Sequence, residues 1–358
     1  MRPIACLLLT LPALGQGFTP RADFESGRFL KALGDAEAQL RSDPGNALAW
    51  AAKSQALSAL LRWPEALAAA DRAVALRPDL ADALLARGIA RAGTAVAQRN
   101  LGSLRGVGRA MDDFRAATQA DPTLGRAWMS LGLGYQQLPG ILGGSTRKAL
   151  ACAGSLRQVS GPKGDLLEGL VRSMDGDWKG AEPCFQRALA AAPGDPEVVT
   201  GWLEQLDGRA AGKALGAEGQ RAWLRSEAAR LLPQVQRRAK GVEAVSEAYL
   251  SAGLPEEAWR AAEAGLHQVE APSILRLQLG KVAARSGRHQ LEGLAYLDQV
   301  LREPLEGGSG GLPAAHWRRG QILRDLGRKE EARSEARRAL DLDAHHQGAL
   351  KLLESLGG

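Results

Sequence analysis

The chain has 358 residues, a formal charge of +6 and only 4% aromatic residues. Abundant alanine, leucine, arginine and glycine suit small side chains packed between closely spaced helices, and they argue against a β-sandwich, which needs β-branched and aromatic residues. We therefore expect an all-α protein. Because acidic and basic residues are interspersed along most of the chain, the basic excess does not predict nucleic-acid binding.

Residues 1–15 are expected to form a secretory signal peptide. An apolar run extends from Pro3 to Leu14, and Ala13-Leu14-Gly15 offers a small-x-small cleavage site before Gln16. The run of about twelve residues is shorter than the roughly 20 that a membrane-spanning helix needs, and Cys6 lies inside it, which does not support a lipid-modified cysteine. The mature protein should be periplasmic or secreted, without a transmembrane segment. A buried or frayed N-terminal helix is the alternative.

A recurring pattern marks the second helix of successive helix pairs. An alanine is followed four residues later by Ala or Phe, then by a small residue after three more, and often by proline after a further five. The pattern predicts the following divisions: a linker and half-repeat at 16–46, an N-terminal array at 47–195, a degenerate repeat at 196–238, a C-terminal array at 239–346 and a capping helix at 347–358.

Three irregular stretches interrupt the regular pairs. About ten extra residues, between Arg91 and Gly108, predict a loop or an extended helix. The insert from Leu138 to Ser145 predicts a loop that ends with Ser145 as a helix N-cap. Asp195-Pro196 is typical of an N-cap followed by the first helical residue, whereas Asp207 to Gly216 is expected to be a glycine-rich break.

One first helix carries a family signature. Trp128, Leu131, Gly132 and Tyr135 have the spacing W-x-x-L-G-x-x-Y, in which the large residues share one helical face and the glycine lets a partner helix approach. This resembles the tetratricopeptide repeat family over nearly the whole chain after the signal. The insert from Leu138 to Ser145 is similar to a feature of secreted and periplasmic bacterial repeat proteins. The resemblance implies an α-solenoid of stacked helix-turn-helix repeats forming a right-handed superhelix.

In this family, certain first-helix positions line a concave groove that binds a peptide. Carried onto this chain, the predicted strip comprises Ala51, Gln55, Met129, Leu133, Gln136, Gln137, Leu166, Leu170, Ser173 and Met174. Methionine, leucine and glutamine there suit an apolar, adaptable groove. The alternative is that these residues only pack between helices. Members that clamp a terminal carboxylate have Lys and Asn where this chain has Ala51 and Gln55, so that clamp is not expected.

Catalytic and metal-binding motifs are not found in the sequence. The glycine-rich stretch from Gly140 to Lys148 lacks the order and the preceding strand of a phosphate-binding loop. His345 and His346 are adjacent, so their side chains point apart and a shared metal is not expected. We therefore expect no enzyme and no cofactor. Cys152 and Cys184 occupy equivalent places on neighbouring helices and should stay unbridged.

These features predict a non-enzymatic scaffold that binds a protein or peptide partner in the cell envelope or outside the cell. Two alternatives are a structural subunit, which could form a homo-oligomer, and a ligand-binding component associated with a transporter. The basic stretches Arg87 to Arg115 and Arg221 to Lys240 are expected to be solvated helix faces. The second stretch is the reserve candidate for partner binding if the strip proves to be core.

Overall fold

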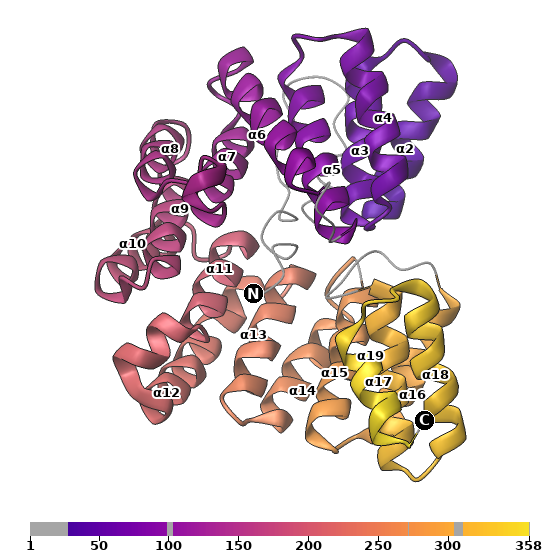
Figure 1. Cartoon of the computed structure of the whole chain (residues 1–358). Helices are drawn as coiled ribbons and strands as arrows, with labels where there is room; N and C mark the ends of the chain where they lie inside the picture. Colours follow the sequence, from indigo (N-terminus) through magenta and orange to yellow (C-terminus); the bar gives the residue numbers. More distant parts are fainter. Residues whose placement is uncertain (1–27, 99–102, 271, 304–310, 358) are drawn as a thin grey trace. The chain divides into compact units, whose positions relative to one another are not determined.

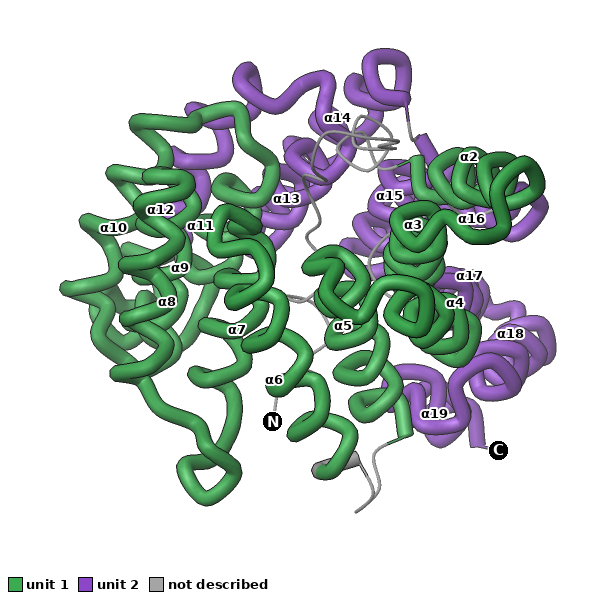
Figure 2. The backbone as a smooth tube through the Cα atoms, turned by 90° about the horizontal axis from the view of Figure 1, so that it is seen from above, with its two compact units in different colours: residues 1–220 green, residues 221–358 purple. Residues whose placement is uncertain are grey.

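The computed structural model describes residues 28–98, 103–270, 272–303 and 311–357, so the predicted signal peptide lies outside the described residues. Within these ranges the chain forms eighteen α-helices and no strand (Figure 1). The all-α prediction and the α-solenoid fold class are therefore confirmed. Two compact units, residues 1–220 and 221–358, divide the chain within the segment predicted to be a degenerate repeat (Figure 2).

Unit 1 consists of helix pairs joined by short turns. Its helices are α2 (Phe29–Ser42), α3 (Ala47–Ala59), α4 (Trp63–Leu76), α5 (Ala81–Gln98), α6 (Ser103–Ala120), α7 (Gly125–Gln137), α8 (Thr146–Val159), α9 (Gly161–Met174), α10 (Trp178–Ala191), α11 (Pro196–Leu206) and the start of α12 (Arg209–Val235). Helices α3, α5, α7, α9 and α11 each contact the next member of this series, and we call them the inner helices of unit 1.

Unit 2 repeats this arrangement after the remainder of α12. Its helices are α13 (Ala239–Ser251), α14 (Pro255–Gly265), α15 (Pro272–Ser286), α16 (Gln290–Arg302), α17 (Gly311–Asp325), α18 (Lys329–Leu342) and α19 (Gln347–Ser355). Helices α13, α15, α17 and α19 contact one another in that order, so the first three are the inner helices of this unit and the last one closes the series.

The signature residues position each helix pair. A Cβ atom on Gly132 of α7 would lie 3.1 Å from the Cβ of Cys152 on α8 and 2.7 Å from a Leu167 methyl, so only glycine permits this approach. The indole N–H of Trp128 donates to the carbonyl of Pro122 at 2.8 Å. Trp50 makes the same bond six residues back, to Pro44, at 3.0 Å, so two repeats share the contact as well as the spacing.

The ends of several helices follow from local sequence. The Ser145 side chain accepts a hydrogen bond from the backbone of Lys148, and the Asp195 carboxylate accepts from the backbone of Glu197 and Val198. Both predicted N-caps are thus confirmed. The predicted break from Asp207 to Gly216 is wrong in extent, because α12 already begins at Arg209. The interruption is limited to the turn at Asp207 and Gly208 between α11 and α12 and to Gly216, whose positive φ of 71° kinks α12.

The insert after α7 is a hydrogen-bonded turn. A short 3₁₀ helix spans Gly140–Leu142, and Gly143 adopts a φ of 91°. The backbone N–H of Gly144 donates to Pro139 and that of Ser145 to Tyr135, which returns the chain to the start of α8. Ile141 at its tip is 95% exposed.

The extra residues before Gly108 mainly lengthen α5 and α6, which reach 18 residues each against 13 or 14 for most other helices of unit 1. Buried Asp113 on α6 accepts hydrogen bonds from Arg87 and Arg91 of α5, each with a contact of 2.7 Å. The expectation that the stretch from Arg87 to Arg115 is only a solvated face is therefore wrong for these two arginines. Their charges hold two helices together.

Cys152 on α8 and Cys184 on α10 are both free and buried, as the spacing of neighbouring helices predicts. Burial raises the pKa of the Cys152 thiol to about 11. The Cys184 thiol lies between the Gly180 carbonyl and the Arg187 guanidinium, at 3.3 Å from each. Both thiols therefore act as small core residues.

Candidate ligand-binding surfaces

The structure places most of the predicted strip inside unit 1. Leu133, Leu166 and Leu170 are at most 2% exposed, and Ala51, Met129 and Ser173 are buried as well. These six residues do not present a surface to a peptide, so the alternative interpretation, packing between helices, describes them as they lie here.

Their neighbours show why they are buried. Ala51 on α3 packs against Ala83 and Ala86 of α5. The side chains of Leu166 and Leu170 on α9 face Gly201 of α11, where an added Cβ would lie 2.7 Å from Leu166. Consecutive inner helices pack so closely that they bury these positions, which would be exposed if the helices lay further apart.

The remaining members of the strip are accessible or polar. Gln136 and Gln137 at the end of α7 are half-buried, and Met174 at the end of α9 is exposed. Gln55 on α3 is only 1% exposed, yet it carries an amide that needs hydrogen-bonding partners. It belongs to a group of three polar residues, and the other two members were not predicted from the sequence.

This group, which we call the polar cluster, consists of Gln55 on α3, Asp82 on α5 and Arg126 on α7. Arg126 Nη1 donates to Gln55 Oε1 at 3.0 Å, across two repeats and 71 residues of sequence. The Asp82 carboxylate is 8% exposed and attracts Arg126 electrostatically without forming an ion pair with it. Three inner helices thus bring their polar side chains to one place.

Three atoms of the polar cluster are buried and make no hydrogen bond: Gln55 Nε2, Asp82 Oδ1 and Arg126 Nη2. Leaving such groups unpaired costs about 1–3 kcal/mol each, and more when they are charged. Burial lowers the pKa of Arg126 to about 10, although the carboxylates of Asp82 and Glu197 oppose this shift. Burial likewise raises the pKa of Asp82, against the effect of Arg126. The cluster therefore carries free hydrogen-bonding capacity.

Its chemistry suits a neutral polar group. Gln55 Nε2 and Arg126 Nη2 are N–H donors, whereas Asp82 Oδ1 is an acceptor. A peptide bond offers the complementary pair, one carbonyl oxygen and one N–H group. Because the charges of Arg126 and Asp82 offset each other, an isolated anion gains less here than an amide does.

Asp82 and Arg126 were missed because the strip was taken only from positions after the signature tryptophan. Arg126 precedes Met129 by three residues and Leu133 by seven, which places all three on one face of α7. A charged residue on a face that is otherwise apolar is the signal that identifies Arg126. Asp82 has the corresponding place at the start of α5, ahead of Leu85 and Ile89.

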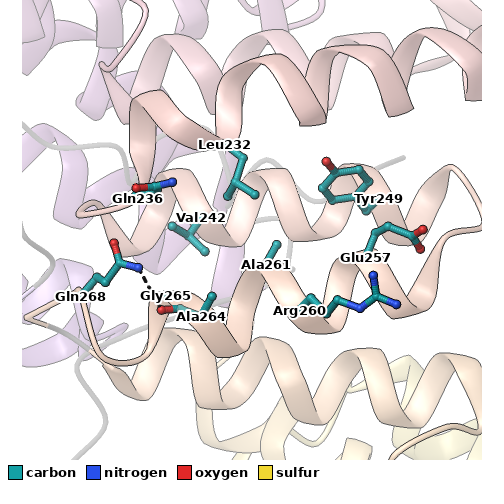
Figure 3. A pocket seen from close by; sticks show the side chains of 10 residues that line it. All are labelled: Leu232, Gln236, Val242, Tyr249, Glu257, Arg260, Ala261, Ala264, Gly265 and Gln268. Atoms are coloured by element: carbon teal, nitrogen blue, oxygen red, sulfur yellow. Dashed lines mark hydrogen bonds between the residues drawn. The ribbon is translucent and has the colours of Figure 1, made fainter.

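A second candidate surface lies in unit 2, where α12 and α14 border a groove over α13 (Figure 3). This α12–α14 groove encloses about 230 Å³. Leu232, Val242 and Ala261 supply its apolar centre. Figure 3 shows Tyr249, Glu257 and Arg260 gathered at one end and Gln236 and Gln268 at the other. None of these polar residues belongs to the predicted strip.

The described part of the chain shows neither a metal site nor a membrane-spanning helix. No group of three or more His, Cys, Asp or Glu side chains there is arranged to hold a metal ion. None of the helices within these ranges combines the length and the hydrophobicity that crossing a membrane requires. His346, one of the two adjacent histidines, caps α19 through Nδ1 and packs edge-on against Trp317.

Comparison with known proteins supports the repeat assignment. Residues 313–346, which include α17 and α18, match the tetratricopeptide repeat model. No protein of curated function matches the chain. Two solved structures are similar to this chain, each at 15% sequence identity. The first is that of the APC/C hetero-tetramer Cut9–Hcn1, for which the similarity covers 93% of this chain and 53% of that chain with a TM-score of 0.44. The second is that of Pseudomonas aeruginosa pilF, for which it covers 64% of this chain and 97% of that chain with a TM-score of 0.41.

The chain thus spans about half the length of the first of these structures. The stacked hairpins and the matched repeat define an α-solenoid repeat protein, a class whose extended surfaces bind other proteins. The resemblance stated from the signature residues is supported at this level.

Proposed function

We propose that the protein is a non-enzymatic scaffold that binds an extended peptide segment of a partner protein on the inner helices of unit 1. The polar cluster is the observation that carries this proposal. Its three unpaired atoms are buried in this structure, so the peptide has to displace the surrounding side chains to reach them, and their donors and acceptor then match a peptide bond. Half-buried Gln136 and Gln137 and exposed Met174 supply further contacts along α7 and α9. Side-chain amides that bind main-chain groups give affinity with little dependence on peptide sequence.

Replacing Arg126 by methionine is expected to weaken peptide binding at least about tenfold, because one lost charge-assisted hydrogen bond in a desolvated site is worth roughly 1.5–3 kcal/mol. Peptides selected from a random display library on the full chain provide the probe, and titration calorimetry provides the measurement. Gln55→Leu should act in the same direction. Arg41→Met, which changes an exposed arginine in the last turn of α2, is the matched control.

A melting curve accompanies each variant, so that lost binding is separated from lost folding. If the selected peptides bind Arg126→Met as tightly as the unchanged protein, the polar cluster is not their site. The basic stretch from Arg221 to Lys240 then becomes the next candidate for the peptide-binding site. Binding there would weaken as salt rises from low to physiological concentration, because exposed charges are screened over about 8–10 Å.

We also propose that the scaffold acts in the cell envelope or outside the cell, on the strength of the N-terminal sequence. The apolar run from Pro3 to Leu14 and the small residues Ala13 and Gly15 support export with cleavage before Gln16. Mass spectrometry of protein recovered from an envelope or secreted fraction should find a mature chain beginning near Gln16. Recovery of exported protein that retains Met1 would contradict the cleavage.

A further inference from the structure

The α12–α14 groove has the size of a site for a small molecule. Its volume of about 230 Å³ lies below the roughly 300–1,000 Å³ of pockets that hold drug-sized ligands, so its occupant is smaller than such a ligand. Val242 is buried in the floor of the groove, Ala261 lines it from α14, and Leu232 covers it from α12. The centre of the groove therefore accepts an apolar side chain.

Tyr249 lines one end of the groove and carries a hydroxyl group. The residue is 8% exposed, and its hydroxyl makes no hydrogen bond to any residue in the described ranges. Burial, followed by the negative charge of Glu257, raises the pKa of Tyr249, so the hydroxyl stays protonated and can donate. The Tyr249 oxygen is not one of the buried polar atoms without a partner, so it is accessible from the groove, where a ligand can accept its hydrogen bond.

Two charged residues line the same end of the groove as Tyr249. Glu257 and Arg260 stand three residues apart on α14, a spacing at which opposite charges usually meet, yet they form no ion pair. The same order and spacing gives closed ion pairs elsewhere in the protein: Asp112–Arg115, Glu227–Arg230, Glu330–Arg333 and Glu335–Arg338. At the groove, one anion and one cation therefore remain available within one helical turn, at the same end as Tyr249.

We propose that the α12–α14 groove binds a free apolar α-amino acid as its zwitterion. The carboxylate accepts hydrogen bonds from Tyr249 and Arg260, the ammonium group pairs with Glu257, and the side chain lies over Val242 and Ala261. Such a ligand satisfies all three polar groups at once and fills the apolar centre. This site lies in unit 2 and does not depend on the peptide site proposed for unit 1.

The charge pattern separates this ligand from related ones. A fatty acid or the C-terminal carboxylate of a peptide satisfies Tyr249 and Arg260, but it leaves Glu257 beside a second negative charge. An amine alone leaves Arg260 and the hydroxyl unpaired. Glycine carries both charges but leaves the apolar centre uncovered, which forgoes about 25 cal/mol for each Å² that a leucine side chain buries.

The test is titration calorimetry of the full chain with L-leucine, compared with three analogues that each remove one feature. N-acetyl-L-leucine lacks the ammonium group, L-leucinamide lacks the carboxylate, and glycine lacks the side chain. L-leucine should bind, and each analogue should bind at least about tenfold more weakly, since each loses one charge-assisted contact or the apolar burial.

Three substitutions assign the binding to the groove. Tyr249→Phe, Glu257→Gln and Arg260→Gln should each weaken L-leucine binding at least about tenfold. Tyr296→Phe on α16 and Glu263→Gln on α14 are matched controls, because neither residue lines the groove, and both should leave binding unchanged. Melting curves show whether each variant keeps its fold.

Several results overturn the proposal. The proposal is wrong if L-leucine does not bind. It is also wrong if L-leucine binds the Tyr249→Phe and Glu257→Gln variants as tightly as the unchanged protein. If N-acetyl-L-leucine binds as tightly as L-leucine, the assignment of Glu257 to an ammonium group fails, and the groove binds carboxylates instead. None of these outcomes bears on the peptide site proposed for unit 1, which the Arg126→Met variant tests separately.

Discussion

Alanine in place of Leu133 or Leu170 is expected to lower the free energy of unfolding of unit 1 by about 2–5 kcal/mol for each substitution. Both side chains are almost fully buried, and Leu170 packs towards α11 at Gly201. Removing three carbons from such a position loses apolar burial and leaves a cavity that the surrounding helices fill only in part. Urea unfolding followed by circular dichroism measures the change.

Met174→Ala is the matched control, because Met174 also belongs to the predicted strip and lies on α9 but is exposed. A substitution at such a surface position usually changes stability by less than about 0.5 kcal/mol. If Leu133→Ala and Leu170→Ala unfold like the unchanged protein but lose peptide binding, these residues face a groove after all. Early unfolding with normal binding of the folded fraction identifies them as core.

Trp202→Ala should have an equal or larger effect on unit 1, about 3–5 kcal/mol. Trp202 on α11 is completely buried, and its ring lies 5.8 Å from that of Trp178 and 5.5 Å from that of Phe185, both on α10. Aromatic pairs at such distances contribute about 0.5–1.5 kcal/mol beyond their buried area. The substitution removes both pairs, and with them the aromatic contacts that join α11 to α10.

Two measurements check this prediction. The first is the midpoint of urea unfolding, compared with that of Trp202→Phe, which keeps an aromatic ring and should recover a large part of the loss. The second is hydrogen exchange, in which the amides of α11 should lose protection before those of α5 and α6. Uniform loss of protection throughout unit 1 would contradict a local anchoring role.

Short patterns with a direct physical cause were enough to predict the fold. Gly132 was expected to permit close helix packing, and it touches both α8 and α9. Ser145 and Asp195 were expected to be N-caps, and each accepts the predicted backbone hydrogen bonds. The extent of the break at Gly216 was wrong, because glycine content indicates where a helix can bend and does not fix how far the helix continues on either side.

The site was less predictable, because groove positions depend on how closely the helices stack. Sequence spacing placed Leu133 and Leu170 in the first helices of their repeats, but it did not show that both side chains are buried in the stack. The polar cluster joins residues 71 positions apart, a separation at which no local pattern operates. Arg126 was detectable as a lone charge among apolar neighbours, whereas its contact with Gln55 required the three-dimensional structure.

The turn that carries Ile141 has a consequence for how this protein withstands proteases. Proteolysis of a folded segment requires that the segment opens locally, so exposure alone does not make a loop vulnerable. Here the backbone bonds from Gly144 and Ser145, together with the positive φ of Gly143, hold the segment in a folded turn. Ile141, the most exposed of the large hydrophobic side chains in the described residues, therefore lies where proteolysis first requires these bonds to break.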